Sequence, residues 1–235
     1  LFAAFLGFFF YKNRKKNLSL AKQKKLLEAT IDEKNVLLKE THHRVKNSFQ
    51  IVSSLLYLQS ENMVDKEAQI ALREAQNRVR SMVLIHQRLY SKDQLVGIDS
   101  KEYLEALTKD ISETHQFKKE KLPYVLNIEP IVLSIETITP IGLILNELII
   151  NVLKHAFENI TAESLLSIDF KKMDDTLHLK VVDNGKGFNG KIKETSFGIK
   201  LMDTLAKKLR ATLNYESSKN NGTEVILNIK KFEIL

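Results

Sequence analysis

The stretch that most constrains the fold is residues 40–59, ETHHRVKNSFQIVSSLLYLQ, in which apolar side chains recur at helical spacing. At about 100° per residue, one side of the helix carries an apolar seam within an arc of roughly 60°; its members are Val45, Phe49, Val52 and Leu56. On the same wheel His43 points about 160° away from Val45, beside Glu40 and Asn47. We therefore expect an exposed imidazole, which by itself fits a nucleophile, a metal ligand or a solvated surface residue.

A second amphipathic segment follows a polar turn at residues 60–65 and extends to about Tyr90. Its apolar face contains Ala68, Leu72, Ala75, Val79, Met82 and His86. Two complementary seams predict a helical hairpin, and we interpret His86 as a packed residue of that hairpin. Because a lone hairpin buries little apolar surface, we expect a homodimer in which two hairpins form a four-helix bundle.

The N-terminal residues 1–11, LFAAFLGFFFY, are uncharged and apolar, and residues 12–39 follow as a basic segment. Seven basic and no acidic residues lie between Lys12 and Lys25, which equals the formal net charge of +7. Because a membrane span needs about 20 residues and the sequence starts with Leu, we interpret residues 1–11 as the cytoplasmic end of a truncated transmembrane helix. An interfacial helix, a signal-peptide remnant and a basic nucleic-acid arm are the alternatives.

The basic residues gather beside this apolar segment and do not interleave with aromatic residues on a domain face, so no nucleic-acid partner is expected. Residues 12–39 also continue the apolar seam near heptad spacing, at Leu27, Ile31 and Leu38. We interpret them as a juxtamembrane basic segment and signalling helix. The sequence has no cysteine, which excludes a disulfide framework and a Cys-based zinc site.

Residues 91–100 are predicted to be a linker, because they contain Asp93, Gly97 and Asp99. The linker would separate a helical domain at residues 40–91 from a second domain at residues 100–235. In the second domain, Thr139 and Pro140 predict a helix start, with the threonine as N-cap and the proline in the first turn. Other expected helices are residues 101–116 and 199–209, and expected strands are residues 124–128, 165–170, 177–182, 212–217 and 224–229. This order indicates an α+β layer sandwich.

The helix predicted to begin at Pro140 has one apolar and one polar face. The polar face spans an arc of about 60° and contains Glu147, Asn151, Lys154 and Glu158. A solvated surface explains such residues, but an amide between a carboxylate and a lysine also suits Mg²⁺ and phosphate, because hard cations take oxygen ligands.

Three further motifs fit a ligand site. Asp183 ends an apolar strand and can accept a hydrogen bond from an exocyclic amine, while Gly185 and Gly187 permit a tight turn. An ordinary hairpin loop has the same D-x-G-x-G pattern. Gly198 opens a helix whose free N–H groups suit a phosphate, and Thr223 precedes the last strand.

H-R-V-K-N at residues 43–47, followed by an apolar helix, resembles the phosphoacceptor box of sensor histidine kinases, in the H-R-x-K-N type related to the HWE kinases. Four motifs of the second domain resemble, in order, the N, G1, G2 and G3 boxes of the GHKL (Bergerat) ATPases. They are NELIINVLKHA at residues 146–156, the loop after Asp183, the helix start at Gly198, and Thr223. The resemblance implies a helical-hairpin dimerisation domain followed by a GHKL/Bergerat α/β sandwich. The second glycine box departs from the pattern, because only Gly198 remains and the lid at residues 188–197 is short.

The resemblance implies a two-component sensor kinase of the bacterial inner membrane whose kinase portion lies in the cytoplasm. It would autophosphorylate His43 with ATP and Mg²⁺ and pass the phosphoryl group to an aspartate of a response-regulator receiver domain. Two alternatives are a GHKL ATPase that hydrolyses ATP and a degenerate nucleotide-binding module without histidine phosphorylation. The expected exposure of His43 argues against the first, and the intact Asn151 and Asp183 argue against the second.

By position, the resemblance assigns Asn151 to Mg²⁺ and Asp183 to the adenine amine. The other implied binding residues are Lys154 and His155 for phosphate, Gly185, Gly187 and Gly198 for the pocket and lid, and Thr223 for the adenine end. Glu147 is a candidate catalytic carboxylate. Glu40, one turn before His43, is expected to orient the imidazole or accept its proton.

Overall fold

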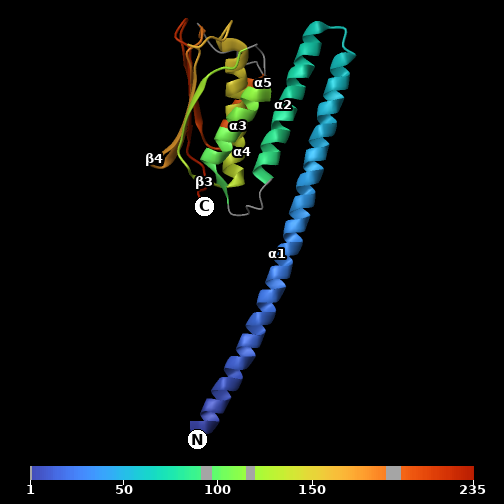
Figure 1. The fold of residues 1–235 in the computed structure, drawn as a ribbon, viewed down its shortest axis with the longest axis vertical. Helices are drawn as coiled ribbons and strands as arrows, with labels where there is room; N and C mark the ends of the chain where they lie inside the picture. The colour runs from blue at the N-terminus through green and yellow to red at the C-terminus, as the bar shows by residue number, and fades with distance from the viewer. Residues whose placement is uncertain (1, 91–96, 115–119, 189–196) are drawn as a thin grey trace. The chain divides into compact units, whose positions relative to one another are not determined.

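The computed structural model describes residues 2–90, 97–114, 120–188 and 197–235 (Figure 1). The chain divides into two compact units, Leu1–Ser48 and Phe49–Leu235. The first unit is the N-terminal part of the long helix α1 (Phe2–Glu61). Its described side chains are exposed or partly buried, as expected of a helix without a packed partner within its own unit.

Residues 2–11 form the start of helix α1. Among the described residues, the one helical stretch long and apolar enough to cross a membrane is Ile135–Ala156, and 72% of its most apolar window is buried inside the protein. That stretch is a core helix of the second unit. The transmembrane interpretation of residues 1–11 stays a prediction.

The second unit begins with the predicted helical hairpin. The end of α1 and the helix α2 (Lys66–Tyr90) are joined by a short turn, with Asp65 Oδ1 accepting a hydrogen bond of 3.1 Å from the Glu67 amide. The rings of Phe49 and His86 lie 6.4 Å apart in an edge arrangement, which confirms His86 as a packed residue. All six residues of the predicted apolar face of α2 are partly buried.

The remaining residues form a layer sandwich, as predicted. Its five-stranded sheet has the order β2-β4-β5-β7-β6, antiparallel except for the parallel pair β2 and β4. The strands are β2 (Tyr124–Ile128), β4 (Leu166–Met173), β5 (Thr176–Asp183), β6 (Thr212–Ser217) and β7 (Thr223–Ile229). Helices α3 (Ser100–Thr114), α4 (Ile135–Asn151) and α5 (Phe197–Lys208) lie against one face of the sheet (Figure 1).

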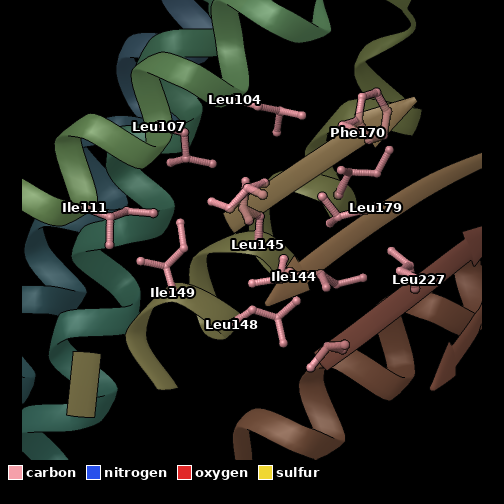
Figure 2. Packing of buried hydrophobic residues seen from close by; sticks show 14 of the residues in the cluster. Leu104, Leu107, Ile111, Ile144, Leu145, Leu148, Ile149, Phe170, Leu179 and Leu227 are labelled. Atoms are coloured by element: carbon pink, nitrogen blue, oxygen red, sulfur yellow. The ribbon is translucent and has the colours of Figure 1, made fainter. Parts of the chain in front are cut away.

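The core lies between these helices and the sheet. The alternating pattern of β5 buries every second side chain, which is the period expected of a strand with one covered face. Figure 2 shows Leu145 and Ile149 of α4 packed with Leu107 of α3 and with Leu179 of β5. The core positions predicted for α3 are all nearly inaccessible to solvent: Tyr103, Leu104, Leu107 and Ile111.

The predicted start of the central helix is wrong. Helix α4 begins at Ile135, so Thr139 and Pro140 lie inside it, and the Thr139 hydroxyl donates to the Ile135 carbonyl at 2.6 Å. The residue before the helix is Ser134, whose hydroxyl pairs with that of Thr137 at 3.0 Å. The proline is tolerated because it lies near the helix start and removes only one helical hydrogen bond.

Two other boundaries also differ from the prediction. Helix α4 continues into a π-helical turn, η1 (Val152–Ala156), and the helical stretch ends at Ala156. Glu158 therefore does not belong to its polar face. Ile98 and Asp99, expected in the linker, form the strand β1 (Ile98–Asp99), which pairs with β3 (Val132–Leu133). The rest of the predicted linker, residues 91–96, lies outside the described residues.

Candidate nucleotide site and phosphoacceptor helix

The first part of the candidate site is the end of strand β5, where Asp183 is only 4% exposed. Its Oδ1 accepts a hydrogen bond of 2.9 Å from the Gly185 amide. Burial raises the pKa of the Asp183 carboxyl, although hydrogen bonds from Gly185 and from the amide and hydroxyl of Thr223 oppose this change. The structure therefore brings Asp183, Gly185 and Thr223 together, and their expected role in an adenine site stays a prediction.

The glycines that follow Asp183 are required by close packing. A Cβ atom at Gly185 would lie 2.3 Å from the carbonyl oxygen of Ala156, at the end of η1. Gly187 has a φ of 55°, and a Cβ atom added there would clash with the Ser218 carbonyl oxygen. The Lys186 amide also donates to the Ala156 carbonyl at 2.8 Å. The loop after β5 is thus fixed against both η1 and the β6–β7 turn.

The β6–β7 turn completes this end of the sheet. The Ser217 hydroxyl donates to the Gly222 carbonyl at 2.8 Å and lies 3.1 Å from the Thr223 hydroxyl. It also accepts a hydrogen bond of 3.0 Å from the Phe188 amide. Residues 189–196, which make up most of the predicted lid, lie outside the described residues.

The second part of the candidate site lies along α4 and η1. Asn151 is the last residue of α4 and is partly buried, and Lys154 and His155 lie in the π-helical turn. Such turns occur frequently at functional sites. Partial burial lowers the pKa of the His155 imidazole, and the neighbouring Lys154 lowers it further, while Glu74 raises it. We therefore expect a neutral His155 at pH 7.

The donor set around Asn151 fits Mg²⁺ bound mainly by a nucleotide. In the described ranges there is no group of three or more His, Cys, Asp or Glu side chains that would hold a metal ion by itself. Magnesium is commonly held by one or two protein oxygens together with phosphate oxygens and water. The Asn151 amide oxygen matches that requirement, and the metal would then arrive with its nucleotide.

Glu147 and Lys154 are engaged by α2. The Arg78 Nε donates to both carboxylate oxygens of Glu147 at 3.1 Å, and the Glu147 side chain is 2% exposed. The Lys154 Nζ donates to Glu74 Oε1 at 2.9 Å. The Lys154 hydrogen bond is the largest influence on the Glu74 carboxyl and lowers its pKa.

Sequence reasoning missed Glu74 and Arg78. They form an acidic and basic pair four positions apart on α2, a pattern that a solvated helix surface shows equally well. Arg78 also lies over the ring of Phe197, with 5.1 Å between its Cζ and the ring centroid. Gly198 is buried beside this cluster, and a Cβ atom there would lie 2.8 Å from Glu147 Oε2.

The candidate phosphoacceptor helix belongs to the first unit. His43 is exposed, as predicted. The Glu40 carboxylate accepts a hydrogen bond of 2.9 Å from Arg44 Nε, and both side chains are largely exposed. The side chain of the adjacent His42 lies outside the described residues. The expected role of Glu40 toward His43 stays a prediction.

Comparison with known proteins gives matches to two family models. A histidine kinase model matches residues 40–115, and a histidine kinase-like ATPase domain model matches residues 127–229. The sensor histidine kinase PdtaS of Mycobacterium tuberculosis is 29% identical over 204 residues, covering 83% of this chain and 40% of that protein. The sensor protein VraS of Staphylococcus aureus is 29% identical over 223 residues, covering 91% of this chain and 59% of that protein. The chain thus spans less than two thirds of these relatives.

Solved structures share the fold. The histidine kinase domain of the Erythrobacter litoralis EL346 blue-light activated histidine kinase has a TM-score of 0.59 and 21% sequence identity, covering 77% of this chain and 95% of that chain. A longer structure of the same kinase has a TM-score of 0.61 and covers 80% of this chain. With the two family models, which together span the helical hairpin and the ATPase sandwich, these matches place the chain in the histidine kinase family.

Proposed function

We propose that the chain is the kinase portion of a two-component sensor histidine kinase. In this proposal the γ-phosphoryl group of ATP passes to His43 and then to an aspartate of a response-regulator receiver domain. The observation that carries the proposal is the exposed His43 imidazole, at the start of the residues that match a histidine kinase model, in a chain that also contains an ATPase domain of the same family.

In the first step a ring nitrogen of His43 would form a bond to the γ-phosphorus as the bond to the bridging oxygen of ADP breaks. Neutral imidazole supplies the electron pair, and its N–H proton leaves for a base or water. We assign the role of proton acceptor to Glu40, which lies one helical turn before His43. A Glu40→Gln variant that autophosphorylates at the wild-type rate would remove Glu40 from the mechanism.

The chain's other residues would bind and orient the nucleotide, because phosphoryl transfer depends mainly on positioning and charge neutralisation. The Asp183 carboxylate would accept a hydrogen bond from the adenine amine. Lys154 would supply positive charge to the phosphates, and the neutral His155 would contribute a hydrogen bond. Mg²⁺, held through Asn151, supplies further charge neutralisation when bound.

Incubation of the protein with γ-labelled ATP and Mg²⁺ tests the proposal. A histidine kinase gives a protein-bound label that is acid-labile and alkali-stable, and His43→Ala abolishes it. A label that survives His43→Ala but is lost in His42→Ala would identify His42 as the acceptor. Released inorganic phosphate without protein label would instead indicate an ATPase, and nucleotide binding without either product would indicate a signalling module.

We also propose that the chain acts as a homodimer. On α1, Ile51, Leu55 and Leu58 form a stripe at helical spacing and are 61%, 55% and 56% exposed. This apolar surface supports a four-helix bundle made with a second copy. Sedimentation of the wild type and of Leu55→Asp tests it, since only the variant should be monomeric.

A membrane attachment through the N-terminal segment is part of the same proposal. Phe8, Phe9 and Phe10 are exposed on α1 and precede the basic segment. This order of apolar and basic residues supports a cytoplasmic membrane end with the kinase portion on the positively flanked side. Flotation of the full chain with lipid vesicles, compared with a chain lacking residues 1–11, tests the attachment.

A further inference from the structure

Helix α2 contacts the candidate nucleotide site through two charged side chains. Arg78 pairs with Glu147 on α4, and Glu74 pairs with Lys154 on η1. By resemblance to the GHKL ATPases, Glu147 is a candidate catalytic carboxylate and Lys154 a candidate phosphate ligand. The helical hairpin that leads to the candidate phosphoacceptor therefore contributes the ion-pair partners of two site residues.

The Arg78 contact is the more enclosed of the two. The Arg78 side chain is 17% exposed, and its Nε donates to both carboxylate oxygens of Glu147. The same guanidinium covers the ring of Phe197, the first residue of α5. Arg78 thus contacts α4 and α5 simultaneously, beside the buried Gly198. Removing one partner of a buried ion pair is strongly destabilising, because the remaining charge stays desolvated without a partner.

These contacts compete with the proposed chemistry. While Arg78 Nε donates to both oxygens of Glu147, fewer lone pairs of that carboxylate remain to accept a proton or orient a water molecule near the phosphates. The Lys154 amine, which would neutralise phosphate charge, donates instead to Glu74 at 2.9 Å. Nucleotide phosphates would also bring negative charge close to Glu74, which is already ionised beside Lys154.

We propose that Glu74 and Arg78 form a latch, named here the α2 latch, and that the closed latch and a Mg²⁺-bound adenine nucleotide exclude each other. The inference rests on the proposed nucleotide binding and adds a regulation of that site. By reciprocity, nucleotide binding opens the latch to the same degree that an open latch strengthens nucleotide binding. Displacement of α2 by a signal would then set the affinity of the ATPase domain.

Calorimetric titration of the full chain with ADP and Mg²⁺ tests the inference. Arg78→Ala is expected to bind ADP about tenfold more tightly than the wild type, within the roughly 5–150-fold range of allosteric coupling. Arg80→Ala is the matched control, because Arg80 is an exposed arginine on the same helix, and its affinity should equal that of the wild type. Equal ADP affinities in the wild type and Arg78→Ala would overturn the latch.

A distance measurement keeps the test decisive if Arg78→Ala folds poorly. Because the chain has no cysteine, spin labels attach only at introduced sites, and Ala71 of α2 and Lys207 of α5 are both exposed. In the otherwise wild-type chain, saturating ADP and Mg²⁺ should shift the label distance away from its nucleotide-free value. An unchanged distance in the nucleotide-bound protein would contradict the latch.

The two proposals fail in different ways. If neither the wild type nor any variant binds ADP, the proposed function fails. The latch then fails with it, and the label distance without nucleotide tests only the contact between α2 and the ATPase domain: Arg78→Ala should move the distance between Ala71 and Lys207, while Arg80→Ala should not. Binding of ADP with no difference between these variants leaves the proposed function standing and removes the latch.

Discussion

The two parts of the candidate nucleotide site are held in different ways. At the end of β5, the Asp183 carboxylate accepts hydrogen bonds from Gly185 and Thr223, and the loop that follows is hydrogen-bonded to the adjacent turn. Along α4 and η1, Glu147 and Lys154 form ion pairs with α2. The ATPase domain thus holds the proposed adenine end by itself, whereas the proposed phosphate end shares its charges with the helical hairpin.

The largest expected effect comes from a glycine at the adenine end. Gly222 has a φ of 71°, and a Cβ atom there would lie 1.9 Å from the Asp183 carbonyl oxygen. Gly222→Ala should lower the free energy of unfolding by about 2–4 kcal/mol, because the turn must move and the backbone is strained. Urea unfolding measures this change.

The matched control is Gly7→Ala on α1, where nothing lies within 4 Å of the new Cβ atom. Alanine favours helix over glycine by about 1 kcal/mol, so this variant should be unchanged or slightly more stable. Similar unfolding midpoints for Gly222→Ala and the wild type would show that the adenine end tolerates rearrangement.

The next effect concerns ligand recognition at the same end. Asp183→Asn should weaken ADP binding about tenfold or more, because the buried amide replaces a charged acceptor with a group that also presents a donor. Calorimetric titration measures the affinity. Asp175→Asn, in the exposed turn between β4 and β5, should leave the affinity unchanged. An unaltered affinity in Asp183→Asn would separate this residue from adenine recognition.

The positions of the residues at the proposed adenine end were largely predictable from the sequence, because they are adjacent to strand boundaries that a period of two reveals. Leu177, Leu179 and Val181 are buried as that period requires, which places Asp183 at the end of β5. Thr139 and Pro140 led to a wrong helix start, because this dipeptide fits both the first turn of a helix and a position one turn further in. The π-helical turn, which excluded Glu158 from the polar face, has no signal in a fixed 100° wheel.

The phosphate end was predictable only in part. The shared polar face of Glu147 and Lys154 follows from local spacing on one helix. Their partners lie far away in the sequence, because Arg78 is 69 positions from Glu147 and Glu74 is 80 positions from Lys154, and no periodicity links such distant positions. The sequence also did not reveal that Glu147 is only 1% exposed, because a charged residue on the polar face of a helix is expected to be solvated. Long-range pairing of charges requires the folded arrangement.

A smaller effect separates charge from geometry in the α2 latch. Arg78→Lys keeps the positive charge but replaces the planar guanidinium, which also covers Phe197, with a single ammonium group. We expect ADP affinity to rise about two- to fivefold, less than in Arg78→Ala. Titration of the three proteins under identical conditions measures the order. An Arg78→Lys affinity equal to that of Arg78→Ala would mean that charge alone contributes nothing to latch closure.

The smallest effect is a pH dependence, and the two ends of the site should differ in sign. The pKa of Glu74 is lowered, chiefly by the hydrogen bond from Lys154, so its contribution to latch closure is present above its ordinary value of 4.5 and is lost as the pH falls through the lowered pKa. Glu74 is 40% exposed, so the contribution is below about 1 kcal/mol. The pKa of Asp183 is raised by burial, so acidification through that raised pKa, above the ordinary 3.8, favours the folded adenine end.

Spin-label distances between Ala71 and Lys207, measured from pH 7 down to about 3, isolate the Glu74 contribution when the wild type is compared with Glu74→Gln. The open population should rise with acid in the wild type relative to the variant, because only the wild type has a carboxylate to protonate at that position. Carboxyl groups elsewhere titrate in both proteins and cancel in the difference. Parallel pH profiles would assign latch closure to Arg78 and Glu147 alone, and the phosphate end would then depend on one buried ion pair.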